Sequence, residues 1–100
     1  MVSKLTSEAR AAFFADHPGW LEADGKDAAV RTFRFGSFAE AFGWMARIAI
    51  EADKADHHPE WFNVYDRVEV TLTTHDAGGL SERDLRMAAV MDAAYANPRP

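Results

Sequence analysis

The strongest constraint on the fold is a strict alternation of side chains in residues 68–74. One face of this segment carries Val68, Val70, Leu72 and Thr74. The opposite face carries Glu69, Thr71 and Thr73. Successive side chains of a strand point to opposite faces, so this segment buries one face and leaves the other in water. That arrangement is typical of an antiparallel sheet that is covered on one side only.

Three further strands are expected around this one. Residues 61–65 precede the alternating segment, and Asp66-Arg67 between the two indicates a tight connection. Residues 20–23 and 28–35 flank Asp24-Gly25, a dipeptide that favours a hairpin turn. The chain therefore contains two predicted hairpins, which together supply four antiparallel strands.

Two segments before the alternating strand have the features of helices. Residues 7–16 form one candidate, which ends at His17-Pro18-Gly19. Ser37 and Glu40 have the spacing of a capping box, and a long helix is expected from there to about Ala55. Its expected apolar stripe consists of Phe38, Phe42, Met45, Ile48, Ala49 and Ala52.

A last helix is expected after a second capping-box spacing, from Ser81 to Asp84, and it should run to about Tyr95. It is apolar on much of its circumference, at Leu85, Met87, Ala88, Ala89, Val90, Met91 and Ala94. In a domain this small, a helix that is apolar on two sides is expected to pack against the sheet with one side and against a partner subunit with the other.

These elements predict an α+β domain of two layers. A four-stranded antiparallel sheet carries three helices on one face, in the order α-β-β-α-β-β-α. A chain of 100 residues has room for one hydrophobic core, so residues 1–100 are expected to form a single domain. Residues 96–100 are expected to fray, because Pro98 and Pro100 cannot continue a helix.

The composition narrows the class of function. Lys and Arg number 11 and Asp and Glu number 16, which gives a net charge of −5. This charge argues against direct binding to nucleic acid or to an anionic membrane surface, since both attract cations. The sequence contains no cysteine, which excludes disulfides, thiol catalysis and cysteine-ligated metals. No segment resembles a membrane span or a secretory signal, so a cytoplasmic protein is expected.

Three of the four histidines fall into two polar clusters. His57 and His58 precede Pro59 between the long helix and the third strand, and His75 follows Thr74 at the end of the fourth. If these strands are antiparallel neighbours, both clusters lie at the same edge of the sheet. Imidazoles change protonation state near neutral pH and serve as general acids and bases. Several carboxylates are close in sequence, namely Asp53, Asp56, Asp76 and Asp84.

Other interpretations of these residues remain open. A histidine pair before a proline is most often a solvated polar turn. Three imidazoles and a water form a known zinc arrangement, although adjacent residues such as His57 and His58 tend to point apart. Asp84 has the default role of accepting a backbone N–H in its capping box. Trp61 is by default a strand aromatic, and His17, at a helix end, is a surface residue with no assigned role.

Two longer motifs resemble a known family. Residues 53–65 read DKADHHPEWFNVY, and residues 72–84 read LTTHDAGGLSERD. Both closely resemble the pterin-4a-carbinolamine dehydratases, and the similarity extends over residues 20–89. The departures are small: the family often has Glu where Asp53 stands and Phe where Trp44 stands.

The resemblance implies loss of water from a 4a-hydroxytetrahydropterin, giving a quinonoid dihydropterin that a reductase can recycle. It implies His57, His58 and His75 as the catalytic residues, and a reaction that needs no metal ion or other cofactor. The pterin is expected to contact these histidines together with Pro59, Thr74, Asp76 and Ala77. Supporting roles are expected for Asp53, Asp56, Trp61 and Asp84. The resemblance also implies a homodimer or a homotetramer.

Within this reaction, we predict that His57 and His75 deliver a proton to the leaving hydroxyl. His58 is predicted to hold the pterin and to accept the N5 proton. Two other functions compete with this one. Animal relatives of the family also act as dimerisation partners of a homeodomain transcription factor, so a non-enzymatic protein-binding module is the alternative. A zinc hydrolase that uses the three histidines as ligands is the third candidate.

Overall fold

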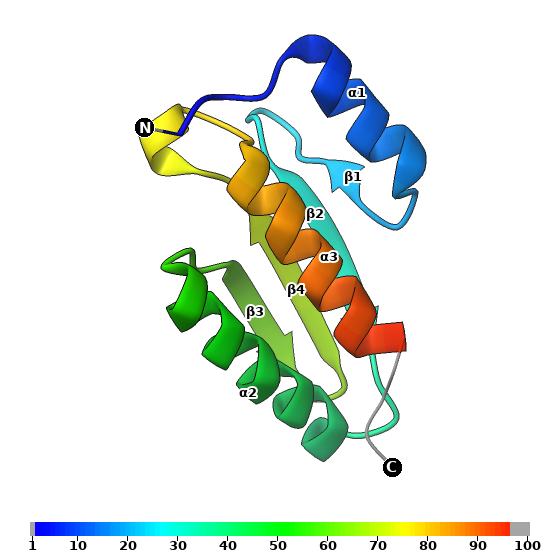
Figure 1. Ribbon diagram of the computed structural model, residues 1–100. Coiled ribbons are helices and arrows are strands. Elements are labelled where there is room, and N and C mark those ends of the chain that lie inside the picture. The colour runs from blue at the N-terminus through cyan, green and yellow to red at the C-terminus, as the bar shows by residue number, and fades with distance from the viewer. Residues whose placement is uncertain (1, 97–100) are drawn as a thin grey trace.

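The computed structural model describes residues 2–96 as a sheet covered by helices (Figure 1). Its elements are α1 (Ser7–Asp16), β1 (Leu21–Glu22), β2 (Ala29–Arg34), α2 (Phe38–Ala55), β3 (Glu60–Val64), β4 (Arg67–Leu72), the short 3-10 helix η1 (His75–Ala77) and α3 (Glu82–Ala96). The expected order of helices and strands is confirmed, and η1 is an addition. Of the tail that was expected to fray, Ala96 ends α3 and residues 97–100 lie outside the described residues.

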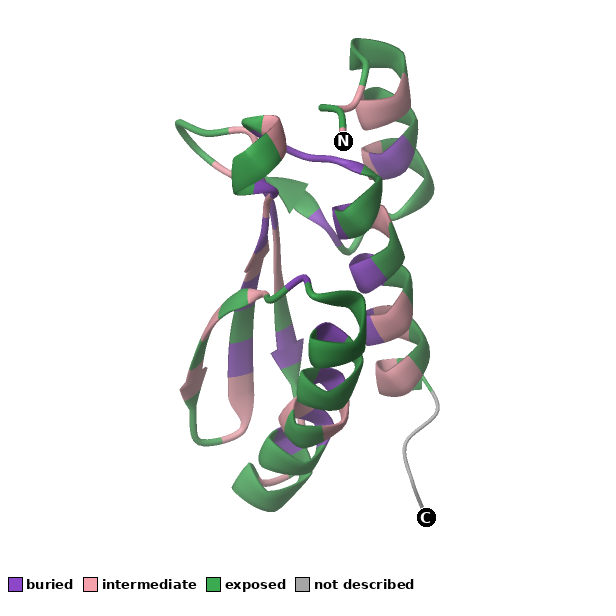
Figure 2. Ribbon diagram, turned by 60° about the vertical axis from the view of Figure 1, so that its left-hand side comes forward, coloured by how far each residue is buried: buried purple, intermediate pink, exposed green. Residues whose placement is uncertain are grey.

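The sheet has the strand order β1-β2-β4-β3, and every neighbouring pair is antiparallel. Strands β2 and β4 are therefore central, and β1 and β3 form the edges. Figure 2 shows the sheet on one side of the molecule and the helices on the other. The predicted α+β class, with a four-stranded open sheet and a helical layer, is confirmed.

The turn between β3 and β4 lies one residue earlier than expected. Its central residues are Tyr65 and Asp66, and Arg67 already pairs with Val64 in the sheet. Tyr65 adopts the left-handed region, with φ 52°. The side chain of Asn63 donates to the carbonyl oxygens of Tyr65, at 3.2 Å, and Arg67, at 2.9 Å. This side-chain clamp supplies the turn geometry that Asp66-Arg67 was expected to provide.

The core lies between the sheet and the helices, with Phe33 at its centre. The Phe33 ring centroid lies 4.5 Å from that of Trp44, 5.0 Å from that of Tyr95 and 5.9 Å from that of Trp20. The alternation in β4 is confirmed, because all four side chains expected on its inner face are buried: Val68, Val70, Leu72 and Thr74. Rings from β2, α2 and α3 thus converge on one point, which fixes how the helices sit on the sheet.

The buried face of α2 differs from the expected stripe. The helix buries Ala41, Trp44, Ile48 and Ala52. Phe38 and Phe42, expected to be inside, are 49% and 56% exposed, and Ala49 is exposed as well. The helix is apolar over a wide arc, so helical periodicity alone does not select its inner face. Tertiary packing selects the side with Trp44, because this indole fits against Phe33 and removes more apolar area from water.

The expectation that α3 packs against the sheet with one side is confirmed, since Met87, Ala88 and Met91 are buried, whereas its contact with a partner subunit stays a prediction. Leu85 and Val90, on its flanks, pack against the core, and Ala89 is the small side chain left outside. Large apolar side chains are exposed elsewhere, at Leu21, Phe38, Phe42, Ile50, Phe62, Val64 and Tyr65. The unpaired apolar surface therefore belongs mainly to α2 and β3. None of the helices in residues 2–96 is long and apolar enough to cross a membrane.

A charge cluster ties α1 to the hairpin of β1 and β2. Arg10 donates from Nε to Asp27 at 2.8 Å and from a terminal nitrogen to Glu22. The bond to Asp27, followed by that to Glu22, raises the pKa of the Arg10 guanidinium above its ordinary value. Together with the buried ring of Phe13, these contacts hold α1 on the core.

Candidate active site

The end of α2, the start of β3 and the end of β4 meet at one end of the sheet (Figure 1). Helix α2 ends at Asp56, which takes the left-handed conformation and turns the chain toward His57. The pairing of Glu60 with Thr71 places the start of β3 beside the end of β4. Both histidine clusters consequently surround one cleft of about 270 Å³. Its lining consists of Asp56, His57, His58, Thr73, Thr74, His75, Asp76 and Arg83.

His57 is the buried histidine of the three. Its side chain is 9% exposed, and Nε2 lies 2.6 Å from Oδ1 of Asp84. The other oxygen of Asp84 accepts from the Thr74 hydroxyl at 2.7 Å and from the Ser81 N–H at 3.0 Å. We assign the hydrogen from this network: a carboxylate that accepts all these bonds requires His57 to donate from Nε2.

The second ring nitrogen of His57 is left for other partners. Nδ1 has no hydrogen bond within residues 2–96. Since every side-chain nitrogen or oxygen of those residues that is fully buried has a hydrogen-bond partner, Nδ1 is not fully buried. Nδ1 is therefore reachable by solvent. Asp84 thus fixes the orientation of the His57 ring. Because it binds Nε2, it also determines that Nδ1 is the ring nitrogen left for a ligand.

Asp84 combines this role with its expected capping role. It accepts the Ser81 N–H, while the Ser81 hydroxyl accepts the N–H of Arg83 at 3.2 Å. The hydroxyl oxygens of Ser81 and Thr74 lie 2.6 Å apart. Because Thr74 gives its hydrogen to Asp84, Ser81 donates to Thr74. The capping spacing predicted the backbone half of this network; its link to His57 appears only in the tertiary structure.

His58 and His75 are exposed and more loosely held. Nε2 of His58 lies 2.9 Å from Oδ1 of Asp53, and Nε2 of His75 lies 3.6 Å from Oε2 of Glu60. Exposed pairs of this kind contribute little to stability, so both rings are free to engage a ligand. The adjacent His57 and His58 point to different partners, as expected for neighbours in an extended segment.

The loop that carries His75 is anchored on the hairpin of β1 and β2. Gly79 is buried against Asp27, and a Cβ at this glycine would lie 2.3 Å from Asp27 Oδ2. The Thr73 hydroxyl donates to the carbonyl oxygen of Asp27 at 3.0 Å. Gly78 takes a positive φ of 76°, which glycine adopts without strain. The glycine pair is therefore a structural turn that positions His75.

Some residues with expected roles do not line the cleft. Pro59 lies directly before β3 and Ala77 ends η1, so both flank the cleft in the chain without lining it. The Trp61 ring faces the core, with its centroid 6.3 Å from that of Trp44. This favours the default interpretation of Trp61 as a strand aromatic.

Two residues that the sequence patterns did not single out are close to the histidines. Arg83 lines the cleft, and its guanidinium has no ion pair within residues 2–96. Glu60 contacts His75 and also lies 3.5 Å from Lys26 Nζ. Arg83 stands inside the second motif, directly before Asp84, which was a usable signal. Glu60 stands inside the first motif, but its contact with His75 depends on strand register, which residue spacing does not reveal.

The geometry gives no support to a zinc site. In the part of the chain that the structure describes, no group of three or more His, Asp or Glu side chains is placed to hold a metal ion. Each of the three histidines directs Nε2 to a different carboxylate, on Asp84, Asp53 and Glu60. The rings therefore do not converge on one point.

Fold and cleft together define a small α+β domain with a histidine-lined cleft at one end of an open antiparallel sheet. Such a cleft is suited to acid–base chemistry on a small polar ligand. The family model described as pterin 4 alpha carbinolamine dehydratase matches residues 3–94. The chain belongs to this family, and the resemblance drawn from the two histidine motifs is confirmed.

Bacterial relatives match over nearly the whole chain. A protein of Paraburkholderia xenovorans (strain LB400), named "Putative pterin-4-alpha-carbinolamine dehydratase", is 57% identical over 96 residues, which are 96% of this chain and 100% of that protein. A protein of the same name from Burkholderia multivorans (strain ATCC 17616 / 249) is 55% identical over 100 residues, covering 100% of this chain and 98% of that protein.

Two solved structures share the fold. A crystal structure described as a transcriptional coactivator/pterin dehydratase from Brucella melitensis has a TM-score of 0.90 and 45% identity, and the match covers 93% of this chain and 99% of that chain. A pterin dehydratase-like protein, described as a RuBisCO assembly factor in the alpha-carboxysome, has a TM-score of 0.68 and 24% identity, covering 82% and 95%. The second likeness shows the fold alone.

Proposed function

We propose that this protein dehydrates a 4a-hydroxytetrahydropterin to the quinonoid dihydropterin, as a step in pterin recycling. The observation that carries the proposal is the grouping of His57, His58 and His75 around one cleft in a chain of this family. We place the reaction in the cytoplasm, which suits a sequence without cysteine.

The chemistry explains why imidazoles suit the reaction. Water leaves when the bond between C4a and the hydroxyl oxygen breaks, and hydroxide is a poor leaving group unless an acid protonates it. The electron pair of N5 forms the C4a=N5 double bond, and N5 then loses its proton to a base. The site must therefore donate one proton and accept another. Imidazoles do both near neutral pH.

The geometry favours His57 as a proton donor. When His57 is protonated, Nε2 donates to Asp84, and Nδ1 carries the proton that can be delivered. His75 is the second donor, and His58, beside Asp53, holds the pterin and takes the N5 proton. Thr74, which lines the cleft, supplies a polar contact to the bicycle.

The same proposal includes the other residues that were expected to contact the pterin or to support the histidines. Around the pterin, Pro59, Asp76 and Ala77 complete the binding segments, and Arg83 is added to them because it lines the cleft. Asp53 and Asp84 support His58 and His57 directly. Asp56 turns the chain at the end of α2, and Trp61 anchors β3 on the core.

A direct assay tests the activity. Chemically generated 4a-hydroxytetrahydropterin is followed by ultraviolet absorbance with and without the full chain. The protein is expected to accelerate the loss of the carbinolamine, and to do so equally after exhaustive treatment with a chelator. No acceleration contradicts the proposal. A dehydration rate that disappears with the chelator and returns with zinc would assign the three histidines to a zinc site and contradict direct proton transfer by their rings.

Asp84→Asn is expected to lower the dehydration rate by about 10²-fold, because the partner that orients His57 is lost. The amide nitrogen that replaces one oxygen also faces a hydrogen-bond donor, at a cost of about 1–3 kcal/mol in the free energy of unfolding. Rates measured over a range of pH, together with urea unfolding, check both effects.

A matched control for this variant is Glu82→Gln, in the same turn of α3. Glu82 is exposed and pairs with Arg86 on its own helix at 3.5 Å. The control is expected to keep both rate and stability. An Asp84→Asn variant with an unchanged rate and an unchanged pH profile would show that Asp84 is only a helix cap.

We also propose that the protein is a homodimer or a homotetramer. The exposed apolar side chains of Phe38, Phe42 and Ile50 on α2 and of Phe62 on β3 support this, because monomers rarely expose so much apolar surface. As an edge strand, β3 also offers unpaired backbone groups. Sedimentation equilibrium is expected to give two or four chains, and Ile50→Lys to shift the distribution to smaller species. A monomeric wild type contradicts the proposal.

The second candidate function is a protein-binding module without catalysis. It is favoured by the same apolar surface and by the Brucella melitensis relative, which is described as a transcriptional coactivator as well as a pterin dehydratase. A stoichiometric protein partner, recovered from cells that do not need a dehydratase, would favour it. In that case, substitutions of the cleft histidines would leave the partner bound.

A further inference from the structure

A second cavity lies at the opposite end of α2 from the histidine cleft. It has a volume of about 550 Å³, twice that of the cleft, and is formed by the end of β2, the first half of α2 and the end of α3. Trp44, in its wall, precedes Ala55, the last residue of α2, by 11 residues, or about 16 Å at ~1.5 Å per helical residue, and His57 follows beyond that end. The two sites therefore cannot share one small ligand.

Three aromatic rings form an apolar wall of this cavity. The ring centroid of Phe35 lies 5.5 Å from that of Trp44 and 5.4 Å from that of Tyr95. The Tyr95 hydroxyl donates to the carbonyl oxygen of Arg34 at 2.9 Å, and the Trp44 indole N–H faces the carbonyl oxygen of Met91 at 3.4 Å. The polar atoms of both rings are thus used inside the protein. Trp44 is almost completely buried, so the partly exposed rings of Phe35 and Tyr95 supply the apolar surface for a flat ligand.

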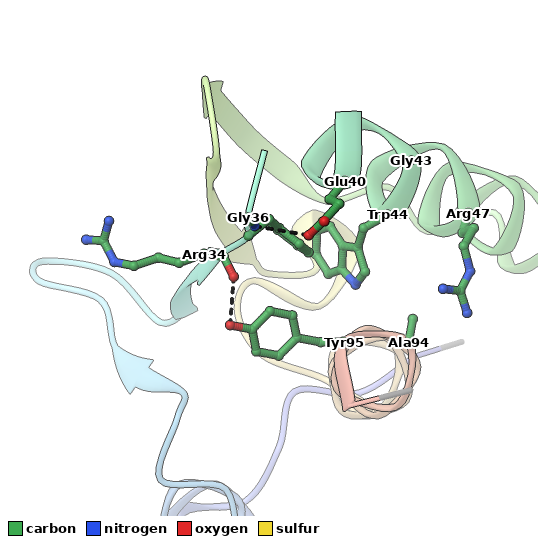
Figure 3. A pocket seen from close by; sticks show the side chains of 9 residues that line it. Arg34, Gly36, Glu40, Gly43, Trp44, Arg47, Ala94 and Tyr95 are labelled. Atoms are coloured by element: carbon green, nitrogen blue, oxygen red, sulfur yellow. Dashed lines mark hydrogen bonds between the residues drawn. The ribbon is translucent and has the colours of Figure 1, made fainter. Parts of the chain in front are cut away.

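Charged side chains mark the two ends of the wall. Figure 3 shows Glu40 on one side of Trp44 and Arg47 on the other, next to Ala94, whereas the side chain of Arg34 points away. Glu40 is engaged as a cap, because its Oε1 accepts the Gly36 N–H at 3.0 Å. The charge left to act on a ligand is therefore that of Arg47.

Arg47 has no counter-ion among the residues that the structure describes. It is half-buried, and within residues 2–96 its guanidinium makes no hydrogen bond or ion pair. A partly buried cation in this state gains most from an anionic partner, and the planar guanidinium binds a carboxylate through two parallel hydrogen bonds. The cavity therefore combines an aromatic wall with a cation that has no ion pair within residues 2–96.

Gly43 supplies the room for a ligand. It lies in the interior of α2, where glycine costs about 1 kcal/mol relative to alanine. Packing does not require it, since a Cβ at this position would meet no atom within 4 Å. Because Gly43 lines the cavity, any larger side chain there would reduce the open space.

We propose that this cavity binds a small planar aromatic molecule that carries a carboxylate or a similar anionic group. The ring lies against Phe35 and Tyr95, beside the indole of Trp44, and the anion pairs with Arg47. This site is separate from the histidine cleft and does not depend on the proposed dehydration.

The test uses 2-naphthoate as the probe and uncharged 2-naphthamide as its matched counterpart. Indole N–H signals of the ¹⁵N-labelled full chain are followed by NMR, with the Trp44 signal assigned from Trp44→Phe and the buried Trp20 as a reference. We expect 2-naphthoate to shift the Trp44 signal in a saturable manner and to bind at least tenfold more tightly than 2-naphthamide. Arg47→Gln and Gly43→Leu should each weaken 2-naphthoate at least tenfold, whereas Arg86→Gln, outside the cavity, should not.

Three kinds of outcome would overturn the proposal. The first is the absence of a saturable shift of the Trp44 signal. The second is equal affinity for the charged and uncharged probes, or an Arg47→Gln variant that binds as the wild type does. In the third, Gly43→Leu changes the sedimentation of the protein but not probe binding, which would assign the cavity to a contact between two copies of the chain.

Discussion

Replacing His57 and His75 together by alanine is expected to reduce the dehydration rate by about 10⁴-fold or more while the chain stays folded. Each imidazole that transfers a proton in the transition state contributes roughly 10²–10⁴-fold. His57 is held by Asp84 and His75 lies on the loop anchored at Asp27, so both approach one cleft from different elements. The measurement is single-turnover dehydration of the carbinolamine, followed by ultraviolet absorbance.

The control for this experiment is His17→Ala. His17 is exposed at the end of α1, and its ring contacts Phe13 at a centroid distance of 5.0 Å, far from the cleft in the fold. It should keep the full rate. Loss of His57 leaves Asp84 one partner short, so circular dichroism and urea unfolding accompany the assay. A folded double variant with a near-normal rate would refute the catalytic assignment.

Trp44→Ala is expected to lower the free energy of unfolding by about 3–5 kcal/mol, the range for removing a large buried aromatic side chain. The Trp44 ring contacts Phe33 and Phe35, and the cavity left behind would lie at the centre of the core. Phe42→Ala, on the exposed side of the same helix, is expected to cost less than about 1 kcal/mol.

Urea unfolding at several protein concentrations measures both variants and separates monomer stability from any contribution of subunit association. The pair tests which side of α2 is inside. Equal losses for Trp44→Ala and Phe42→Ala, independent of concentration, would contradict the packing described for this helix.

Much of the candidate site was predictable from local signals. His57, His58 and His75 stood out because two polar clusters flank a predicted pair of adjacent strands, and an antiparallel pair brings the start of one beside the end of the other. The roles of Asp84 and Glu60 were not predictable at this level. Their contacts with His57 and His75 cross from one element to another, and such contacts have no signature in residue spacing.

Local sequence patterns were enough to predict the number, type and order of the main elements and the inner face of β4. These depend on local patterns: a capping box at Ser37, a turn at Asp24-Gly25, and a two-residue period in β4 that allows only one inner face. Tertiary structure decided the strand order β1-β2-β4-β3, the inner face of α2 and the partner of each histidine. The apolar arc of α2 is wider than its contact with the sheet, so several rotations of the helix about its axis would bury similar apolar area. The packing of Trp44 against Phe33 selects one of these rotations.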